Sequence, residues 1–203
     1  MPDGRPTMTL RQTLRLIRSD LDASIRHRGG SPRWQSRLAG LLAPAGCGLA
    51  IWRVQAYLHR RRVPIVNRIL GVVNLVLFAL EMEPEIDADE GLVLLSPAGI
   101  MLHGHTRIGR ECVFAHQITT ALGPRLGFDP IHDFIVIGDR VVISAGVRIV
   151  GNLTIGADSW VGPNTVVAES IPPGSLVCGR SVRPRAPAIP DYESAPNLAA
   201  SRR

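Results

Sequence analysis

Residues 135–168 read IVIGDRVVISAGVRIVGNLTIGADSWVGPNTVVA. Within this stretch an aliphatic residue recurs at every sixth position, and a Gly or another small residue follows several of these positions. The aliphatic residues are Ile137, Ile143, Ile149, Ile155, Val161 and Val167. A period of six fits neither an α-helix nor the two-residue alternation of an ordinary strand. It predicts a parallel β-helix, in which the aliphatic residues point inward and the small residues let the chain turn its corners.

The same period continues toward the N-terminus. Met82, Ala88, Leu94 and Ile100 lie six residues apart, and Ile108, Phe114 and Thr120 resume the period after two extra residues. We therefore expect a two-residue shift between Ile100 and Ile108. Residues 121–134, between the two blocks, are rich in Gly, Pro and Asp. This composition predicts a long loop that leaves the coil, and long loops in compact repeats are often functional.

The residues before the repeat are predicted to be helical. Leu10, Leu14, Ile17, Leu21 and Ile25 follow the spacing of one helical face, and further helical stretches cover residues 46–62 and 64–80. The residues after position 183 are rich in Pro, Ala and Ser, which is typical of a mobile tail. We therefore predict an α+β fold: a helical N-terminal domain (1–80), a parallel β-helix (81–183) and a C-terminal tail (184–203).

Composition narrows the class of partner. The chain has 203 residues, of which 45% are hydrophobic and 20% charged, and this excludes wholesale disorder. A net charge of +6 is common in proteins that bind nucleic acid. However, all 23 basic residues are Arg, and they are spread along the chain apart from the run at residues 60–62. We therefore expect no nucleic-acid partner.

The cysteines and the apolar segments point to a cytoplasmic protein. Cys47, Cys112 and Cys178 match neither a disulfide nor a metal-ligand spacing, so we expect free thiols and no metal. The N-terminus is polar and does not resemble a signal peptide. The longest apolar run, residues 69–80, is well short of the roughly 20 residues that span a bilayer. We therefore expect no membrane partner.

Four segments of the sequence resemble a known family. They are LIRSDL at residues 16–21, SPAGI at 96–100, the regular hexads, and IPPGSLVCG at 171–179. With them the sequence resembles the hexapeptide-repeat acyltransferases, and within these the serine acetyltransferases. The resemblance implies a left-handed β-helix, a homotrimer or a dimer of trimers, acetyl-CoA as co-substrate, and active sites between neighbouring subunits.

The resemblance also implies direct acyl transfer, in which a His paired with an Asp takes the proton of the acceptor hydroxyl as it attacks the thioester. Residue by residue, the general-base His falls on Ser96, and the acidic residue that binds the amino-acid substrate falls on Leu95. The orienting Asp falls on Glu81, which keeps the charge. A second active-site His falls on Phe134, with His132 two residues away.

A serine hydroxyl is not a general base near neutral pH, and Leu95 argues against free L-serine as the acceptor. Counting hexads places His116 one coil beyond Ser96, about 5 Å away at the usual distance between strands. We therefore predict that His116 has taken over as the base, that Ser96 leaves room for it or hydrogen-bonds it, and that Glu81 and His132 assist. The alternative is that His116 is a surface imidazole without a catalytic task.

The resemblance places CoA along the last coils and the tail. Arg180, Arg183 and Arg185 follow the last coil, and Arg is suited to bind phosphates through planar bidentate contacts. Ala145, Gly146, Gly162 and Gly179 would let the pantetheine arm lie against the backbone. The same glycines are also explained by corner geometry alone.

These observations favour an acyl-CoA-dependent acyltransferase that acetylates a hydroxyl group. The acceptor is serine or, more in keeping with Ser96 and Leu95, another small amino-acid-like metabolite. An enzyme of the same pathway is a further predicted partner. One alternative is a family member that has lost catalysis and acts as a binding or scaffold subunit. Another is a structural or metal-binding shell with His at the subunit interface. The enzyme requires that His116 and Glu81 face the same groove as the Arg-rich tail.

Overall fold

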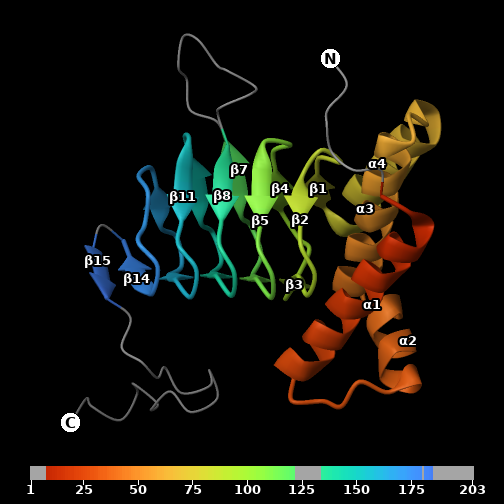
Figure 1. The fold of residues 1–203 in the computed structure, drawn as a ribbon, viewed down its shortest axis with the longest axis horizontal. Coiled ribbons are helices and arrows are strands. Elements are labelled where there is room, and N and C mark those ends of the chain that lie inside the picture. Colours follow the sequence, from red (N-terminus) through yellow and green to blue (C-terminus); the bar gives the residue numbers. More distant parts are fainter. Residues whose placement is uncertain (1–7, 122–133, 180, 185–203) are drawn as a thin grey trace.

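The computed structural model describes residues 8–121, 134–179 and 181–184. Its helices gather at one end of a prism of short strands (Figure 1). The helices are α1 (Leu10–His27), α2 (Trp34–Leu42), α3 (Pro44–Arg60) and α4 (Pro64–Phe78). Thr9 begins α1 with a capping box, in which its hydroxyl accepts from the Gln12 amide and its own amide donates to the Gln12 side chain. Pro44 and Pro64 occupy the first turns of α3 and α4, where a missing N–H costs nothing.

The strands form three sheets, which we call faces A, B and C. Face A comprises β1 (Leu80–Met82), β4 (Ile100–Leu102), β7 (Thr119–Ala121), β10 (Arg148–Val150) and β13 (Val166–Val167). Face B comprises β2 (Asp87–Ala88), β5 (Thr106–Ile108), β8 (Ile135–Ile137) and β11 (Leu153–Ile155). Face C comprises β3 (Val93–Leu94), β6 (Val113–Phe114), β9 (Val142–Ile143), β12 (Trp160–Val161), β14 (Ser175–Cys178) and β15 (Ser181–Pro184).

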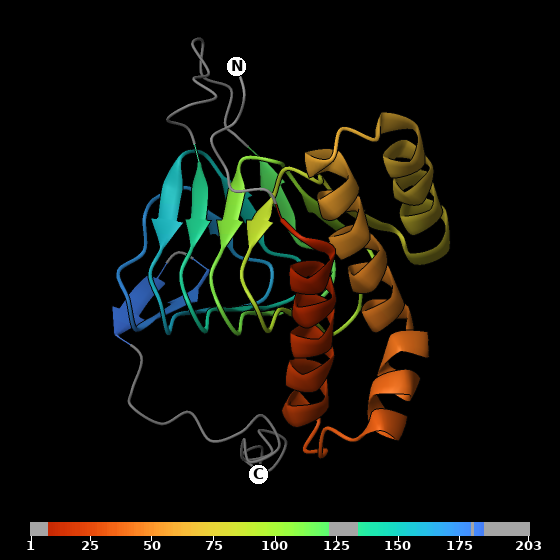
Figure 2. The ribbon, with the colours of Figure 1, turned by 45° about the vertical axis from the view of Figure 1, so that its right-hand side comes forward.

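Each of the first four coils contributes one strand to each face, and the last coil meets face B only through the bridge between Ile155 and Ile171. Neighbouring strands in a face pair in parallel, except for the antiparallel pair β14–β15. This arrangement confirms the predicted parallel β-helix behind a helical N-terminal region (Figures 1 and 2). The exact domain limits at 80/81 and 183/184 stay a prediction, and residues 185–203 lie outside the described part of the chain.

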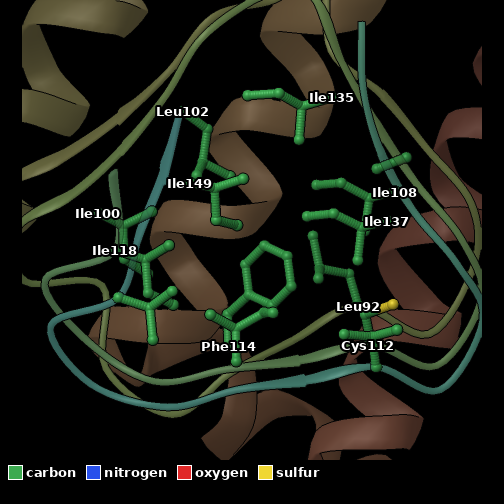
Figure 3. Close-up of a cluster of buried hydrophobic side chains, with 14 of the residues drawn as sticks. Leu92, Ile100, Leu102, Ile108, Cys112, Phe114, Ile118, Ile135, Ile137 and Ile149 are labelled. Atoms are coloured by element: carbon green, nitrogen blue, oxygen red, sulfur yellow. The ribbon is translucent and has the colours of Figure 1, made fainter. Parts of the chain in front are cut away.

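The core fills the inside of the prism, as the period of six predicts. All six aliphatic residues of the second block are buried, with 0–3% of their surface exposed. Figure 3 shows the ring of Phe114 in the interior of the coil, among aliphatic side chains that come from several faces. The hydrophobic repeat therefore encodes the fold directly, because each inward residue packs on its equivalent in the next coil.

The structure moves the two-residue shift to another corner. Leu94 lies opposite Phe114, but Met101 lies opposite Thr119, so the first coil has two more residues than the second between these rungs. The extra residues lie in the corner formed by residues 95–99, and the prediction that they fall between Ile100 and Ile108 is wrong. The period of six could not distinguish these two positions of the shift, because Ile100 is fully buried, like an inward residue of the series. The strand pairing shows that Leu102, opposite Met82, is the residue that continues the series.

Within the described residues, no single helix is long and apolar enough to cross a bilayer. The pair α2 and α3 satisfies such a criterion only when taken together, and these helices are bent by 85° at the break between them.

Candidate active site

The candidate site follows one long edge of the prism, where the chain leaves face C. We call this the C–A edge and define it as residues 95–99, 115–117, 144–146, 162–164 and 179, which follow β3, β6, β9, β12 and β14. The edge contains most of the predicted site residues. They are Leu95, Ser96, His116, Ala145, Gly146, Gly162 and Gly179. Residues that are up to 84 positions apart in sequence are therefore brought into one line.

Backbone hydrogen bonds stack the corners of this edge on one another. The Gln117 amide donates to the Ala98 carbonyl at 2.9 Å, the Gly146 amide donates to the His116 carbonyl at 3.1 Å, and the Asn164 amide donates to the Ala145 carbonyl at 2.8 Å. His116 therefore lies between the corner that contains Ser96 and the corner that contains Ala145 and Gly146. Its side chain is exposed, as a residue that meets a substrate must be.

The register changes the predicted relation between Ser96 and His116. Because Gln117 bonds to Ala98, the residue across from His116 in the first coil is Ala98, and Ser96 belongs to the two-residue bulge. The prediction that His116 stacks directly on Ser96 is therefore wrong in register. Ser96 is half-buried, and its hydroxyl accepts a long hydrogen bond of 3.4 Å from the Ala98 amide. Leu95 beside it is 47% exposed.

Glu81 lies on face A beside the same corner. It is the outward residue of β1, exposed and opposite Met101. Two residues before it, the Ala79 carbonyl accepts a hydrogen bond from the Gly99 amide at 2.9 Å. This bond ties the start of face A to the corner that carries Ser96, so the acidic residue and the bulge come from one coil.

The glycines of the edge are explained by the corners. Gly146 and Gly179 have φ of +75° and +60°, a conformation that other residues adopt with strain. A Cβ on Gly162 would lie 3.0 Å from the sulfur of Cys178 and 3.1 Å from the Val177 carbonyl. Close stacking of the coils and the backbone conformation of the corners account for these residues.

Sequence analysis missed Arg148, which lies next to the edge. Arg148 is the outward residue of β10, exposed, and its guanidinium hydrogen-bonds the Gln117 carbonyl beside His116. The signal was present in the repeat, because Arg148 directly precedes the inward Ile149 and so occupies an outward position. Of the predicted phosphate ligands, Arg183 is exposed in β15, opposite Leu176. Arg180 and Arg185 fall outside the described residues.

A second group of rings lies at the other side of face A, where the chain passes to face B. His105 lies beside Phe134, with ring centroids 5.5 Å apart, and His103 stacks on His105 at 5.6 Å. The guanidinium of Arg107 covers the Phe134 ring at 4.3 Å. His132 lies outside the described residues. Phe134 lies on a different edge of the prism from His116, so a single chain does not bring Phe134 and His116 together.

In the part of the chain that the structure describes, no three His, Cys, Asp or Glu side chains are grouped so that they could hold a metal ion. The imidazole of His103 lies 4.0 Å from the Glu83 carboxylate, which accepts a hydrogen bond from the Gly104 amide at 2.7 Å.

Comparison with known proteins agrees on one family. No family model matches the chain. The serine acetyltransferase of Helicobacter pylori is 29% identical over 143 residues, which cover 70% of this chain and 82% of that protein. Some relatives are longer, and the chain spans 56% of the Mycobacterium tuberculosis serine acetyltransferase.

Solved structures give the same result. Soybean serine acetyltransferase complexed with serine superposes with a TM-score of 0.71 and 26% identity, over 83% of this chain and 69% of that one. A serine acetyltransferase in complex with CoA superposes with a TM-score of 0.72 and 20% identity, over 86% of this chain and 70% of that one. In sequence and in architecture, the chain is similar to serine acetyltransferases.

Proposed function

We propose that the protein transfers an acetyl group from acetyl-CoA to a hydroxyl group of a small, amino-acid-like acceptor. The observation that carries the proposal is the position of His116. Its exposed imidazole stands on the C–A edge, between the corner at residues 95–99 and the corner that contains Ala145 and Gly146. This is the line along which the family resemblance places acceptor and CoA.

In the proposed reaction the neutral imidazole of His116 accepts the proton of the acceptor hydroxyl while the oxygen attacks the thioester carbonyl. The tetrahedral intermediate then collapses, the C–S bond breaks, and the imidazolium returns the proton to the leaving CoA thiolate. Glu81 is the proposed acidic residue of the site and lies on face A, two strands before the coil that contains His116. Ser96 contributes no proton transfer in this scheme, and its small side chain leaves space for the acceptor.

The proposed acceptor differs from free L-serine in the group that would contact Leu95. An exposed leucine offers no charge to an ammonium group, so the proposed acceptor has an apolar or modified group there. Serine itself stays the reference substrate, since the curated relatives are named for it.

The proposed CoA site runs along the C–A edge toward the last coil. Ala145, Gly146, Gly162 and Gly179 would lie along the pantetheine arm, and Arg180 and Arg183 would bind phosphates. We also propose that the β-helix is left-handed, as the family resemblance implies. The proposed assembly is a homotrimer or a dimer of trimers, in which His132 of one subunit faces His116 of the next. A cytoplasmic location and an enzyme of the same pathway as partner also stay predictions.

The test is CoA release from acetyl-CoA in the presence of L-serine and of N-acylated, esterified and peptide-linked serine. We expect turnover with at least one acceptor, and His116→Ala should lower kcat by about 100-fold or more, the usual contribution of a general base. His59→Ala, which removes a half-buried imidazole of α3, is the matched control and should retain full activity. Unchanged turnover in His116→Ala would refute the assignment of the base.

A binding or scaffold subunit is the second candidate, and the replacement of the family's His by Ser96 favours it. This candidate predicts CoA binding by calorimetry without CoA release for any acceptor. In that case Ser96→His, which restores the family residue in the corner, should generate activity, whereas the His116 mechanism does not require this substitution.

A further inference from the structure

The guanidinium of Arg148 is directed toward the corner that contains His116. Arg148 is the exposed first residue of β10, which lies next to β7, the strand that follows His116. Its Nη1 donates to the carbonyl of Gln117, the residue after His116, and to the Val147 carbonyl at 3.4 Å. In the described part of the chain both of its hydrogen bonds therefore come from one nitrogen. The N–H groups of Nε and Nη2 remain for a ligand, because the guanidinium has five donors in a planar fork.

No carboxylate among the described residues neutralises this charge, which sets Arg148 apart from the arginines of another edge. Arg110 lies 3.0 Å from Asp139, and Arg140 lies 2.7 Å from Asp158, so each forms an ion pair between neighbouring coils. Such pairs account for those two arginines without a ligand. Arg148 has only backbone carbonyls as partners there, so its charge at the surface is left unpaired.

No acidic residue of face A or of the C–A edge adjoins Arg148. The C–A edge, as defined above, contains no Asp or Glu. Glu81 is the only acidic residue of face A, and it forms one line of paired residues with Met101, Thr119 and Arg148 across β1, β4, β7 and β10. Three strand spacings, about 14 Å, separate Glu81 from Arg148. The edge beside His116 therefore has a local positive charge, which favours an anionic ligand.

The neighbours of Arg148 indicate the chemistry of the ligand that would fit. Thr119 stands opposite Arg148 in β7, half-buried, and offers a hydroxyl on the same outward line. On the other side of His116, the exposed Leu95 offers neither a charge nor a side-chain hydrogen bond. A small ligand whose hydroxyl lies at His116 would thus meet donors on one side and an apolar side chain on the other. This pattern suits a carboxylate on the first side and a group without a free ammonium on the second.

We propose that Arg148 binds the carboxylate of the acceptor and is the residue that selects it. The two remaining nitrogens of the fork match the two oxygens of a carboxylate, and Thr119 adds a further donor. The acceptor is then a hydroxy acid whose amino group is absent or acylated, such as an N-acylated serine. This proposal rests on the proposed function, because it places the hydroxyl of the same molecule at His116, and it narrows the acceptor to an anionic class.

The phosphates of CoA are the other anions that a guanidinium could bind at this edge. In the proposed CoA site they lie near Arg183, beyond Gly179. Gly179 is three corners further along the C–A edge than Gln117, which is about 14 Å at the usual distance between strands. Arg148 is instead bonded beside His116, at the end where the thioester and the acceptor would meet. The acceptor carboxylate is therefore the anion that its position favours.

The experiment compares four acceptors in which the two charges of serine are removed independently: L-serine, N-acetyl-L-serine, L-serine methyl ester and N-acetyl-L-serinamide. We expect N-acetyl-L-serine, which keeps only the carboxylate, to have the highest kcat/KM. Arg148→Gln should lower kcat/KM about tenfold or more for the two carboxylates and leave the ester and the amide unchanged, because only the carboxylates lose charge-assisted hydrogen bonds. Arg148→Lys, which keeps the charge but not the fork, should restore part of the loss.

Arg110→Gln is the matched control, because Arg110 is an arginine with a 60% exposed side chain on the edge between faces B and C. It should leave all four values unchanged. An equal loss for all four acceptors in Arg148→Gln would show that Arg148 only holds the corner of His116, and this would overturn the proposal. A higher KM for acetyl-CoA without a change in acceptor preference would also overturn it and assign the guanidinium to CoA.

A binding measurement separates this proposal from the proposed function. N-acetyl-L-serine is titrated calorimetrically into the protein in the presence of CoA, which has no acetyl group to transfer. We expect Arg148→Gln to weaken this binding about tenfold or more, and N-acetyl-L-serinamide to bind both proteins equally. If this difference is found although no acceptor is acetylated, the proposed reaction fails and the carboxylate site stands. Equal affinity of both proteins for N-acetyl-L-serine, or no binding to the unaltered protein, would overturn the carboxylate site whether or not turnover is seen.

Discussion

Asp20 in α1 and Arg53 in α3 form a buried ion pair that also holds the first coil of the β-helix. Arg53 Nε lies 2.8 Å from Asp20 Oδ2, and both side chains are at most 4% exposed. The guanidinium also donates to the carbonyls of Ala88 and Asp89 at 2.6 Å each. Asp20 Oδ1 accepts from the amides of Gly91 and Leu92. Two helices and one turn of the coil therefore share one polar cluster.

Breaking this pair should destabilise the protein strongly. Arg53→Met leaves Asp20 as an uncompensated buried charge, and we expect a loss of about 3–5 kcal/mol in the free energy of unfolding, measured by urea denaturation. The control is Asp22→Asn, whose pair with Arg37 is partly exposed and should contribute no more than about 1 kcal/mol. Equal losses for the two variants would show that burial of the Asp20 pair is unimportant.

Two glycines should respond to alanine with opposite signs. A Cβ on Gly156 would lie 2.2 Å from the backbone nitrogen of Pro173, and backbone atoms cannot rotate away. Gly156→Ala should therefore cost about 1–3 kcal/mol or more through overpacking. In α2, a Cβ on Gly40 meets the Leu21 side chain at an ordinary 3.4 Å, so Gly40→Ala should stabilise the protein by about 1 kcal/mol through helix propensity. Thermal unfolding of both variants checks the two signs, and a stable Gly156→Ala variant would contradict the close stacking of the coils.

The cysteines should differ sharply in reactivity toward thiol reagents. Burial raises the pKa of the Cys112 thiol from 9.0 to about 12, so its thiolate is nearly absent at pH 8 to 9 in the folded protein. Cys178 is exposed. Labelling should therefore modify Cys178 quickly and Cys112 only after unfolding, as read by mass spectrometry. Because the folded pKa is the higher one, the stabilisation from the neutral thiol is complete below pH 9 and is lost as pH rises toward 12. Rapid labelling of Cys112 at pH 8 would show that the coil opens readily.

Much of the fold could be predicted from the sequence, because the β-helix repeats one local pattern. An inward aliphatic residue is needed once per strand, so Ile137 and its five successors show the coil without any knowledge of distant contacts. The same repeat placed the candidate site in outline, since residues at equal positions in successive hexads stack along one edge. In this way, hexad counting predicted that His116 lies one coil beyond the corner of Ser96, and the hydrogen bond from Gln117 to Ala98 confirms the coil although not the register.

The tertiary structure alone decided three features. The position of the two-residue bulge depends on which rungs hydrogen-bond between coils, and Ile100 is equally buried in either register, so hydrophobicity does not settle whether Ser96 lies across from His116. The pairing of Asp20 with Arg53 joins residues 33 positions apart, and no local pattern specifies such a contact. The outward direction of Ile65, Ile69, Val72 and Val76 in α4 depends on how α4 packs against α3 through Asn74, because an apolar run has the same sequence whether it faces the core or the solvent.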